Sequence, residues 1–229
     1  MENIFMLRWK TIGLIALITL LTLSKSKAYS QESNFGNWLI YIGNKKINNK
    51  WNIHNEVQYR NYNAIDDLEQ LLLRTGLGYS FNDNKNNVLL GYGYIMAENY
   101  IPLRDEKISI NEHRIYQQFT AKQKVRGVKL NHRYRFEQRF VESDFKMRFR
   151  YFLGLHIPLN KYSDKNNFYL SVYNEIFLNS EPKVFDRNRL YSGLGFQVNK
   201  NFKIEAGYMN QFFEYSGRDQ FNIITFVNF

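Results

Sequence analysis

The chain has no cysteine, which excludes disulfides, thiolate metal sites, cysteine nucleophiles and a lipid-anchored lipoprotein N-terminus. It has three prolines in 229 residues, and beyond the N-terminal segment it has no run of about 20 apolar residues that would span a bilayer as a helix. Tyrosine and phenylalanine are abundant, with 17 and 19 residues. Because proline interrupts strands and aromatic residues favour them, the composition indicates long, uninterrupted strands.

The N-terminus has the three parts of an export signal. Arg8 and Lys10 form a basic region, the apolar segment is "TIGLIALITLLTL" (11–23), and "SKA" (26–28) is a small-x-small cleavage site. We predict a cleaved signal peptide over 1–28 and a single mature domain over 29–229. An uncleaved N-terminal anchor is the alternative.

Period-two alternation recurs through the mature chain. In "NHRYRFEQRF" (131–140) the odd positions are polar or charged, and the even positions are mostly large and aromatic. Such alternation is typical of a strand with two unlike faces. The segments that we predict as strands are 35–43, 50–61, 69–81, 88–97, 110–123, 128–140, 145–158, 168–178, 188–198, 202–213 and 221–229.

The predicted number of strands is odd, which is unusual for a bacterial barrel. Eleven strands would place the two chain ends on opposite sides, whereas bacterial single-chain barrels have even numbers. Either 35–43 is not a full strand or one segment contains two strands, so we expect ten to twelve. A further ambiguity concerns "NAIDDLEQLLLR" (63–74), which has a helical alternative, although its leucines favour a loop followed by a strand.

The connections alternate in character. Compact turns such as "NDNKNN" (82–87), "KVRG" (124–127) and "NKN" (199–201) alternate with connections such as "ENYIPLRDEKISI" (98–110) and "NSEPKVFDRN" (179–188). Short turns at one end and longer loops at the other describe an up-and-down meander whose ends face different compartments.

Residues 145–157 favour a membrane barrel. Seven apolar side chains from Phe145 to Ile157 share one face, and Lys146, Arg148 and Arg150 lie on the other. At about 3.3 Å per residue this strand is long enough to cross a membrane. In a soluble, lipocalin-like barrel the apolar face would point inward, and in an outer-membrane barrel it faces lipid. We predict the second arrangement: an all-β, up-and-down antiparallel transmembrane β-barrel.

Aromatic residues near the predicted strand ends support this prediction, because such residues form girdles at the membrane surfaces. They are Trp38, Trp51, Tyr59, Tyr62, Tyr92, Tyr94 and Tyr208. The chain ends in "FNIITFVNF", whose terminal Phe229 resembles the C-terminal assembly signal of bacterial outer-membrane barrels. The expected location is therefore the outer membrane.

The first predicted hairpin, "FGNWLIYIGNKKINNKWNIHNEVQYRNYN" (35–63), resembles an uncharacterised family of Gram-negative outer-membrane barrels, domain of unknown function 2490. The likeness continues through "RYRFEQRF", "KMRFRYF" and "VNKNFKIEAGY". The resemblance implies an outer-membrane barrel, and it supplies no catalytic residue.

The predicted inner face is heavily charged. The residues that we expect to line the lumen are Glu56, Arg60, Arg74, Glu112, Arg114, Arg133, Arg135, Glu137, Arg139, Arg148, Arg150, Glu175 and Arg189, with Arg187, Lys203 and Glu205 on the same faces. Arginines and carboxylates on such strands form either a ladder of ion pairs that fills a narrow barrel, or an anion-attracting channel or a pocket for an acidic ligand. We favour the filled barrel.

Catalytic patterns are weak. The histidines are His54, His113, His132 and His156, and none lies in an H-x-S arrangement. His54 and Glu56 share a face, but two ligands are too few for a metal site. We predict no catalytic residue, no metal site and no cofactor. Nucleic acid is excluded as a partner because the arginines alternate with carboxylates on an enclosed face.

The sequence therefore predicts a small outer-membrane β-barrel that is either a structural envelope protein or a narrow, anion-leaning channel. A lipid-modifying barrel enzyme (a hydrolase or acyltransferase) and a soluble lipocalin-like periplasmic binder are the alternatives. The expected partners are outer-membrane lipids and lipopolysaccharide, the barrel-assembly machinery and a small anionic solute.

Overall fold

The computed structural model describes residues 35–64, 66–159 and 167–229, and the predicted signal peptide lies outside these ranges. The described part of the chain forms eleven strands and contains no helix that is long and apolar enough to cross a membrane. The strands are β1 Phe35–Lys46, β2 Trp51–Asn61, β3 Leu68–Phe81, β4 Asn86–Tyr100, β5 Lys107–Val125, β6 Val128–Val141, β7 Asp144–Pro158, β8 Phe168–Asn179, β9 Phe185–Gln197, β10 Phe202–Phe212 and β11 Gly217–Asn228.

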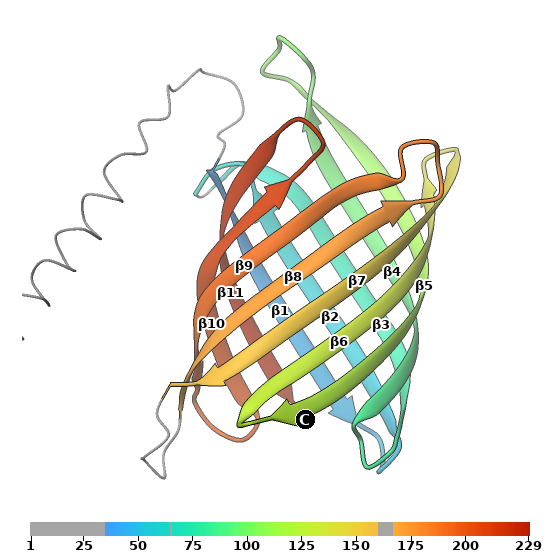
Figure 1. Ribbon diagram of the computed structural model, residues 1–229. Coiled ribbons are helices and arrows are strands. Elements are labelled where there is room, and N and C mark those ends of the chain that lie inside the picture. Colours follow the sequence, from blue (N-terminus) through green and yellow to red (C-terminus); the bar gives the residue numbers. More distant parts are fainter. Residues whose placement is uncertain (1–34, 65, 160–166) are drawn as a thin grey trace, which may run out of the picture. The chain divides into compact units, whose positions relative to one another are not determined.

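The strands close into one barrel, and each strand is tilted across it (Figure 1). Strands that follow one another in sequence pair in antiparallel fashion all the way from β1 to β11. The predicted all-β, up-and-down barrel of ten to twelve strands is confirmed.

The way the barrel closes explains how it can have an odd number of strands. Strand directions alternate, so the first and the eleventh strand run the same way, and they pair in parallel from Phe35↔Asp219 to Asn44↔Asn228. Both explanations that we offered for the count are wrong, because β1 is a full strand and no predicted segment contains two. A parallel pair is only slightly less stable per residue than an antiparallel one, which makes this closure feasible.

We call the end of the barrel where β11 finishes the C-terminal end (marked C in Figure 1), and the other the N-terminal end, where β1 begins. The expected contrast in loop length between the two ends is weaker than predicted. Strands β4 and β5 continue to the pair Tyr100↔Lys107 and leave only residues 101–106 between them. Residues 180–184 separate β8 from β9, and the turn between β6 and β7 is only 142–143.

The ambiguous segment at 63–74 is a loop followed by a strand, as favoured. Strand β3 begins at Leu68, and Asp66 has a φ of 80°, which interrupts a helix. The amide of Tyr62 donates to the carbonyl of Asp67 at 2.8 Å, which closes the turn before β3.

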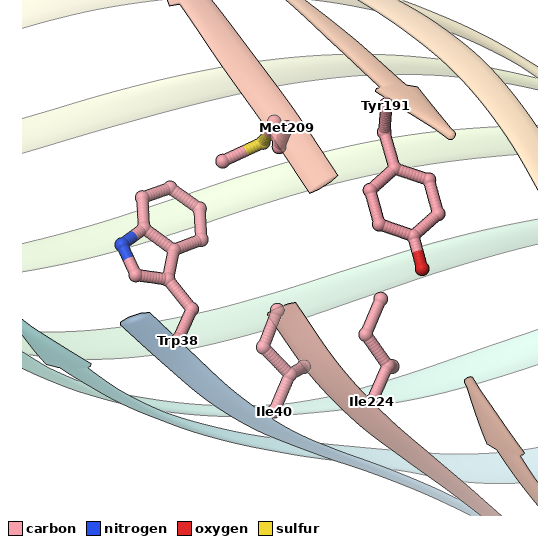
Figure 2. Close-up of a cluster of buried hydrophobic side chains, with 5 residues drawn as sticks. All are labelled: Trp38, Ile40, Tyr191, Met209 and Ile224. Atoms are coloured by element: carbon pink, nitrogen blue, oxygen red, sulfur yellow. The ribbon is translucent and has the colours of Figure 1, made fainter. Parts of the chain in front are cut away.

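Successive side chains alternate between the inside and the outside of the barrel. Large apolar side chains are exposed at many of the outer positions, for example Leu90 at 60%, Leu194 at 58% and Phe149 at 42%. A small apolar cluster lies inside, where Trp38 and Ile40 of β1 meet Tyr191, Met209 and Ile224 (Figure 2).

Two of the residues predicted for the aromatic girdles are buried. Trp38 is inside the barrel at 2% exposure, and Tyr62 is buried at 6%, whereas Trp51 and Tyr208 are exposed as expected. The error at Trp38 has a physical reason: β1 has apolar residues on both faces, so alternation does not distinguish inside from outside.

Candidate functional site

The thirteen charged residues predicted for the lumen all occupy inward positions of their strands. Eleven of them are buried, with exposures between 0% for Glu137 and 7% for Arg60, Arg74 and Arg189. The side chains of Arg133 and Arg139 are 24% and 17% exposed. The inward placement follows from alternation, since each of these residues shares its strand face with other buried residues and its neighbours face outward.

Glu137 is the central carboxylate. Arg148 donates to its Oε2 from Nη2 at 2.7 Å and from Nε at 3.0 Å, and Arg150 donates to its Oε1 at 2.7 Å. The guanidinium of Arg135 lies 3.8 Å from the same carboxylate, and those of Arg74 and Arg114 lie at 4.0 Å. One completely buried negative charge therefore faces five arginines.

Two further carboxylates hold the arginines that surround this centre. Glu175 accepts from Arg133 and Arg150, each at 2.7 Å, and Glu112 accepts from Arg114 at 2.6 Å and also from Arg139. Arg135 and Arg150 are directly opposite one another on β6 and β7, and their like charges repel. The ion pairs with Glu137 and Glu175 offset this repulsion. We call the charged residues of β5–β8 the arginine zone: Glu112, Arg114, Arg133, Arg135, Glu137, Arg139, Arg148, Arg150 and Glu175.

Aromatic rings separate the arginines. Arg60 lies over Trp38 at 3.7 Å from the ring centroid, Arg135 over Tyr116 at 4.5 Å and Arg150 over Phe177 at 4.4 Å. Desolvated cation–π contacts of this kind stabilise a buried guanidinium. These rings were not predicted from the sequence, because an inward aromatic residue interrupts the alternation of charged and apolar residues.

Uncharged amides complete the network. Arg60 has no carboxylate within 4 Å among the described residues, and it donates to Gln58 at 3.0 Å and to Gln70 at 2.6 Å. Arg135 donates twice to Gln118, at 2.6 and 2.9 Å. The interior therefore contains more guanidinium groups than carboxylates and holds some of them with neutral acceptors.

The wall formed by β8–β10 has a different chemistry toward the C-terminal end. We call it the tyrosine zone: Tyr169, Tyr173, Tyr191, Gly193, Gly195 and Gly207. Tyr173 and Tyr191 stack with their ring centroids 4.7 Å apart. A Cβ at Gly195 would lie 2.2 Å from the ring of Tyr169, so the glycine leaves the room that the ring occupies.

The histidines lie apart from one another. His54 bonds Asn44 at 3.0 Å and has its Nε2 3.6 Å from Glu56, while His113 and His132 bond tyrosine hydroxyls on the outer face. His156 is 3.9 Å from Glu205, a carboxylate that accepts from the Tyr169 hydroxyl at 2.7 Å. Within the described ranges no three histidine or acidic residues are grouped to hold a metal ion.

Phe229, the predicted assembly residue, belongs to the closing seam. Its amide donates to the carbonyl of Asn44 at 2.9 Å, and its carbonyl accepts from the amide of Lys46 at 3.3 Å. Its side chain is 65% exposed at the C-terminal end. Its role as an assembly signal stays a prediction.

These features define a small β-barrel protein with an ion-paired interior and an apolar exterior. A family model described as "Protein of unknown function (DUF2490)" matches residues 35–222, and the chain belongs to this family. An uncharacterized protein of Methylorubrum extorquens is 34% identical over 165 residues, which cover 68% of this chain and 69% of the relative. LpxR from Salmonella typhimurium is similar with a TM-score of 0.44 and 14% identity, over 84% of this chain and 88% of that chain.

Proposed function

We propose that the protein is a structural outer-membrane β-barrel whose lumen is closed by its own side chains. The observation that carries this proposal is the combination of a buried, ion-paired interior with an exposed apolar exterior. It favours a closed structural barrel over an open channel or a lipid-modifying enzyme.

The exterior supports a membrane location. Leucine, phenylalanine and tyrosine side chains with exposures of about 40–60% recur around the barrel, and extended exposed apolar surfaces mark sites that contact a membrane or another protein. A strand of 15 residues such as β7 extends about 50 Å, enough to cross the hydrocarbon layer at a tilt. The lipocalin-like alternative needs the apolar face inside, opposite to the observed arrangement. The proposed partners are outer-membrane lipids, lipopolysaccharide and the barrel-assembly machinery.

The interior supports a closed lumen. Water that filled a pore would leave the residues lining it accessible, yet Glu137, Gln220 and Asn222 are 0% exposed and Arg135 is 1% exposed. Five of the lumen arginines, Arg114, Arg133, Arg139, Arg148 and Arg150, are bonded to Glu112, Glu137 or Glu175. An anion-leaning channel would require these pairs to separate.

The lipid-modifying alternative needs a nucleophile that a histidine activates. Ser171 is the cross-strand neighbour of His156, but it is 3% exposed and hydrogen-bonds Glu205. This arrangement satisfies a buried carboxylate and leaves the hydroxyl engaged, so the proposal assigns no catalytic role to it.

The location is tested by fractionation and by substitution on the outer face. The mature protein should fractionate with the outer membrane and migrate faster on SDS gels when unheated than when boiled. Leu90→Arg places a charge on the exposed apolar face and should cost about 2–4 kcal/mol of unfolding free energy if it lies near the bilayer midplane. The control is Leu103→Arg in the β4–β5 loop, where the side chain is already 88% exposed. Equal tolerance of both changes, or recovery as a soluble protein, would refute the membrane location.

The closed lumen is tested by single-channel recording in planar bilayers. Wild type should be silent, and the double variant Arg135→Glu with Arg148→Glu should gain conductance because it breaks the arginine zone. The matched control reverses two exposed charges outside the lumen, Arg104→Glu with Lys183→Glu, and should stay silent. A wild type that conducts anions, with a preference that the lumen variant reverses, would establish the channel instead.

A further inference from the structure

Lysines gather at inward positions of the C-terminal end of the barrel. Lys46 and Lys122 are near the ends of β1 and β5, and Lys129 and Lys203 are near the beginnings of β6 and β10. Each occupies the same alternating face as buried residues of its own strand, for example Tyr116 on β5 and Glu205 on β10. We call Lys46, Lys122, Lys129 and Lys203 the lysine ring.

The members of the ring come from opposite walls. Going either way around the closed barrel, three strands separate the adjacent strands β5 and β6 from β1 or from β10. All four lysines lie within a few residues of the strand ends at this end of the barrel. Their side chains therefore line the inner rim of one barrel end from opposite sides.

Among the described residues, no carboxylate forms an ion pair with the lysine ring. No ion pair within 4 Å joins any of its four members to an acidic group of the described residues, in contrast to the arginine zone. Glu205 acts on Lys203 but already accepts hydrogen bonds from Tyr169 and Ser171. Lys129 also lies directly opposite Lys124 on β5, which therefore shares the inner face and adds a further positive charge at this end.

The other end of the barrel has the opposite balance. Its acidic residues include Asp66, Asp67, Glu98, Asp105, Glu106, Glu142, Asp144, Glu181, Glu214 and Asp219. Its lysines are paired: Lys107 with Asp67, Lys146 with Asp144 and Glu181, and Lys183 with Glu214. Unpaired lysines are therefore specific to the C-terminal end, which argues against a general solubilising surface.

We propose that the lysine ring binds a phosphate group. Like charges held together repel, and an anion between them turns that repulsion into attraction. A phosphate has several acceptor oxygens and up to two negative charges, so ammonium groups from several directions can each donate to it. The proposal rests on the end of the closed barrel and holds whether or not the lumen conducts.

Isothermal titration of inorganic pyrophosphate into the detergent-solubilised barrel tests this site. Wild type should bind saturably at low ionic strength, and binding should weaken as the Debye length falls from about 30 to about 8 Å between 0.01 and 0.15 M salt. Substituting all four ring lysines by glutamine should weaken binding by about tenfold or more, because the attraction is the sum of their charges.

The matched control removes four lysines from the same end that lie on turns or outward positions: Lys45→Gln, Lys50→Gln, Lys85→Gln and Lys200→Gln. All four are exposed, and this variant should bind pyrophosphate within about twofold of wild type. Heat-modified migration on SDS gels checks that each variant folds. If the fourfold ring variant does not fold, the double variant Lys46→Gln with Lys122→Gln replaces it, since both side chains are exposed. Its loss of pyrophosphate affinity should be smaller than that of the fourfold variant but larger than that of the control.

The source of the phosphate is distinguished with dihexanoyl-phosphatidylglycerol, a soluble lipid with one phosphodiester. Tighter binding of this lipid than of pyrophosphate, lost in the ring variant, assigns a lipid headgroup. Weaker binding assigns a free phosphate-bearing solute. Absence of saturable binding of both probes, or an equal loss in the ring and control variants, would overturn the proposal.

Discussion

The arginine zone and the tyrosine zone fill the same narrow lumen by different physical means. In the arginine zone, long side chains occupy the space, and Glu137 and Glu175 hold them by charge. In the tyrosine zone, rings occupy space that glycines on neighbouring strands leave free, as Tyr169 does at Gly195. The first zone depends on electrostatic balance and the second on shape.

Because of this difference, the two zones should tolerate different substitutions. A buried ion pair compensates a large desolvation cost only while both partners are present, so removing one leaves an uncompensated charge. Ring-on-glycine packing has no such charge, and its weak point is added volume. The two zones should therefore fail under different substitutions.

The largest effect should come from Glu137→Gln. The amide removes the charge that faces Arg148 and Arg150 and turns a donor toward them, so the unfolding free energy should fall by about 3–5 kcal/mol. Urea unfolding of the barrel in lipid vesicles measures it. Glu106→Gln is the control, because Glu106 is exposed and its pair with Arg104 is 3.9 Å long; it should change stability by less than about 1 kcal/mol. Similar values for the two variants would contradict an electrostatic role for the arginine zone.

A smaller effect should follow from adding one methyl group to the tyrosine zone. A Cβ at Gly207 would lie 2.5 Å from both the Cα of Gly193 and the carbonyl oxygen of Ser192, which are backbone atoms that move little. Gly207→Ala should therefore cost about 1–3 kcal/mol through overpacking. Gly217→Ala is the control, because its nearest contact is an ordinary 3.5 Å. A tolerated Gly207→Ala would mean that this wall is loosely packed.

Most of the fold could be predicted from the sequence, because alternation over long strands is a local signal. All eleven predicted segments correspond to strands, with ends displaced by a few residues. The parallel closure of β1 on β11 could not be predicted, since pairing of the first and last strands depends on no local pattern. The short connections were missed because the strands continue as paired ladders beyond the apolar alternation, as at Tyr100 and Lys107.

The sequence predicted which charged residues point into the barrel, but it did not predict which of them form ion pairs with one another. Alternation placed Arg135, Glu137 and Arg148 on the inner face, and the charge balance required carboxylates near them. The five-arginine surround of Glu137 depends on register across several strands, which the sequence does not encode locally. Phe177 was missed because a ring inside a charged lumen is recognisable only from the guanidinium that lies over it, whereas Trp38 was missed because β1 has apolar residues on both faces.

The smallest effect should come from Tyr191→Phe, which tests whether the tyrosine zone is stabilised by ring packing or by hydrogen bonds of the hydroxyl groups. The hydroxyl of Tyr191 is buried and has no hydrogen-bond partner within the described chain, so its removal relieves an unsatisfied polar group. Tyr191→Phe should change the unfolding free energy by less than about 0.5 kcal/mol, or raise it slightly. Tyr169→Phe is the matched comparison: its hydroxyl donates to Glu205 at 2.7 Å, and its loss should cost about 1–3 kcal/mol. A large loss at Tyr191 would show that its hydroxyl is bonded through water, and the zone would then depend on polar contacts as well as on ring packing.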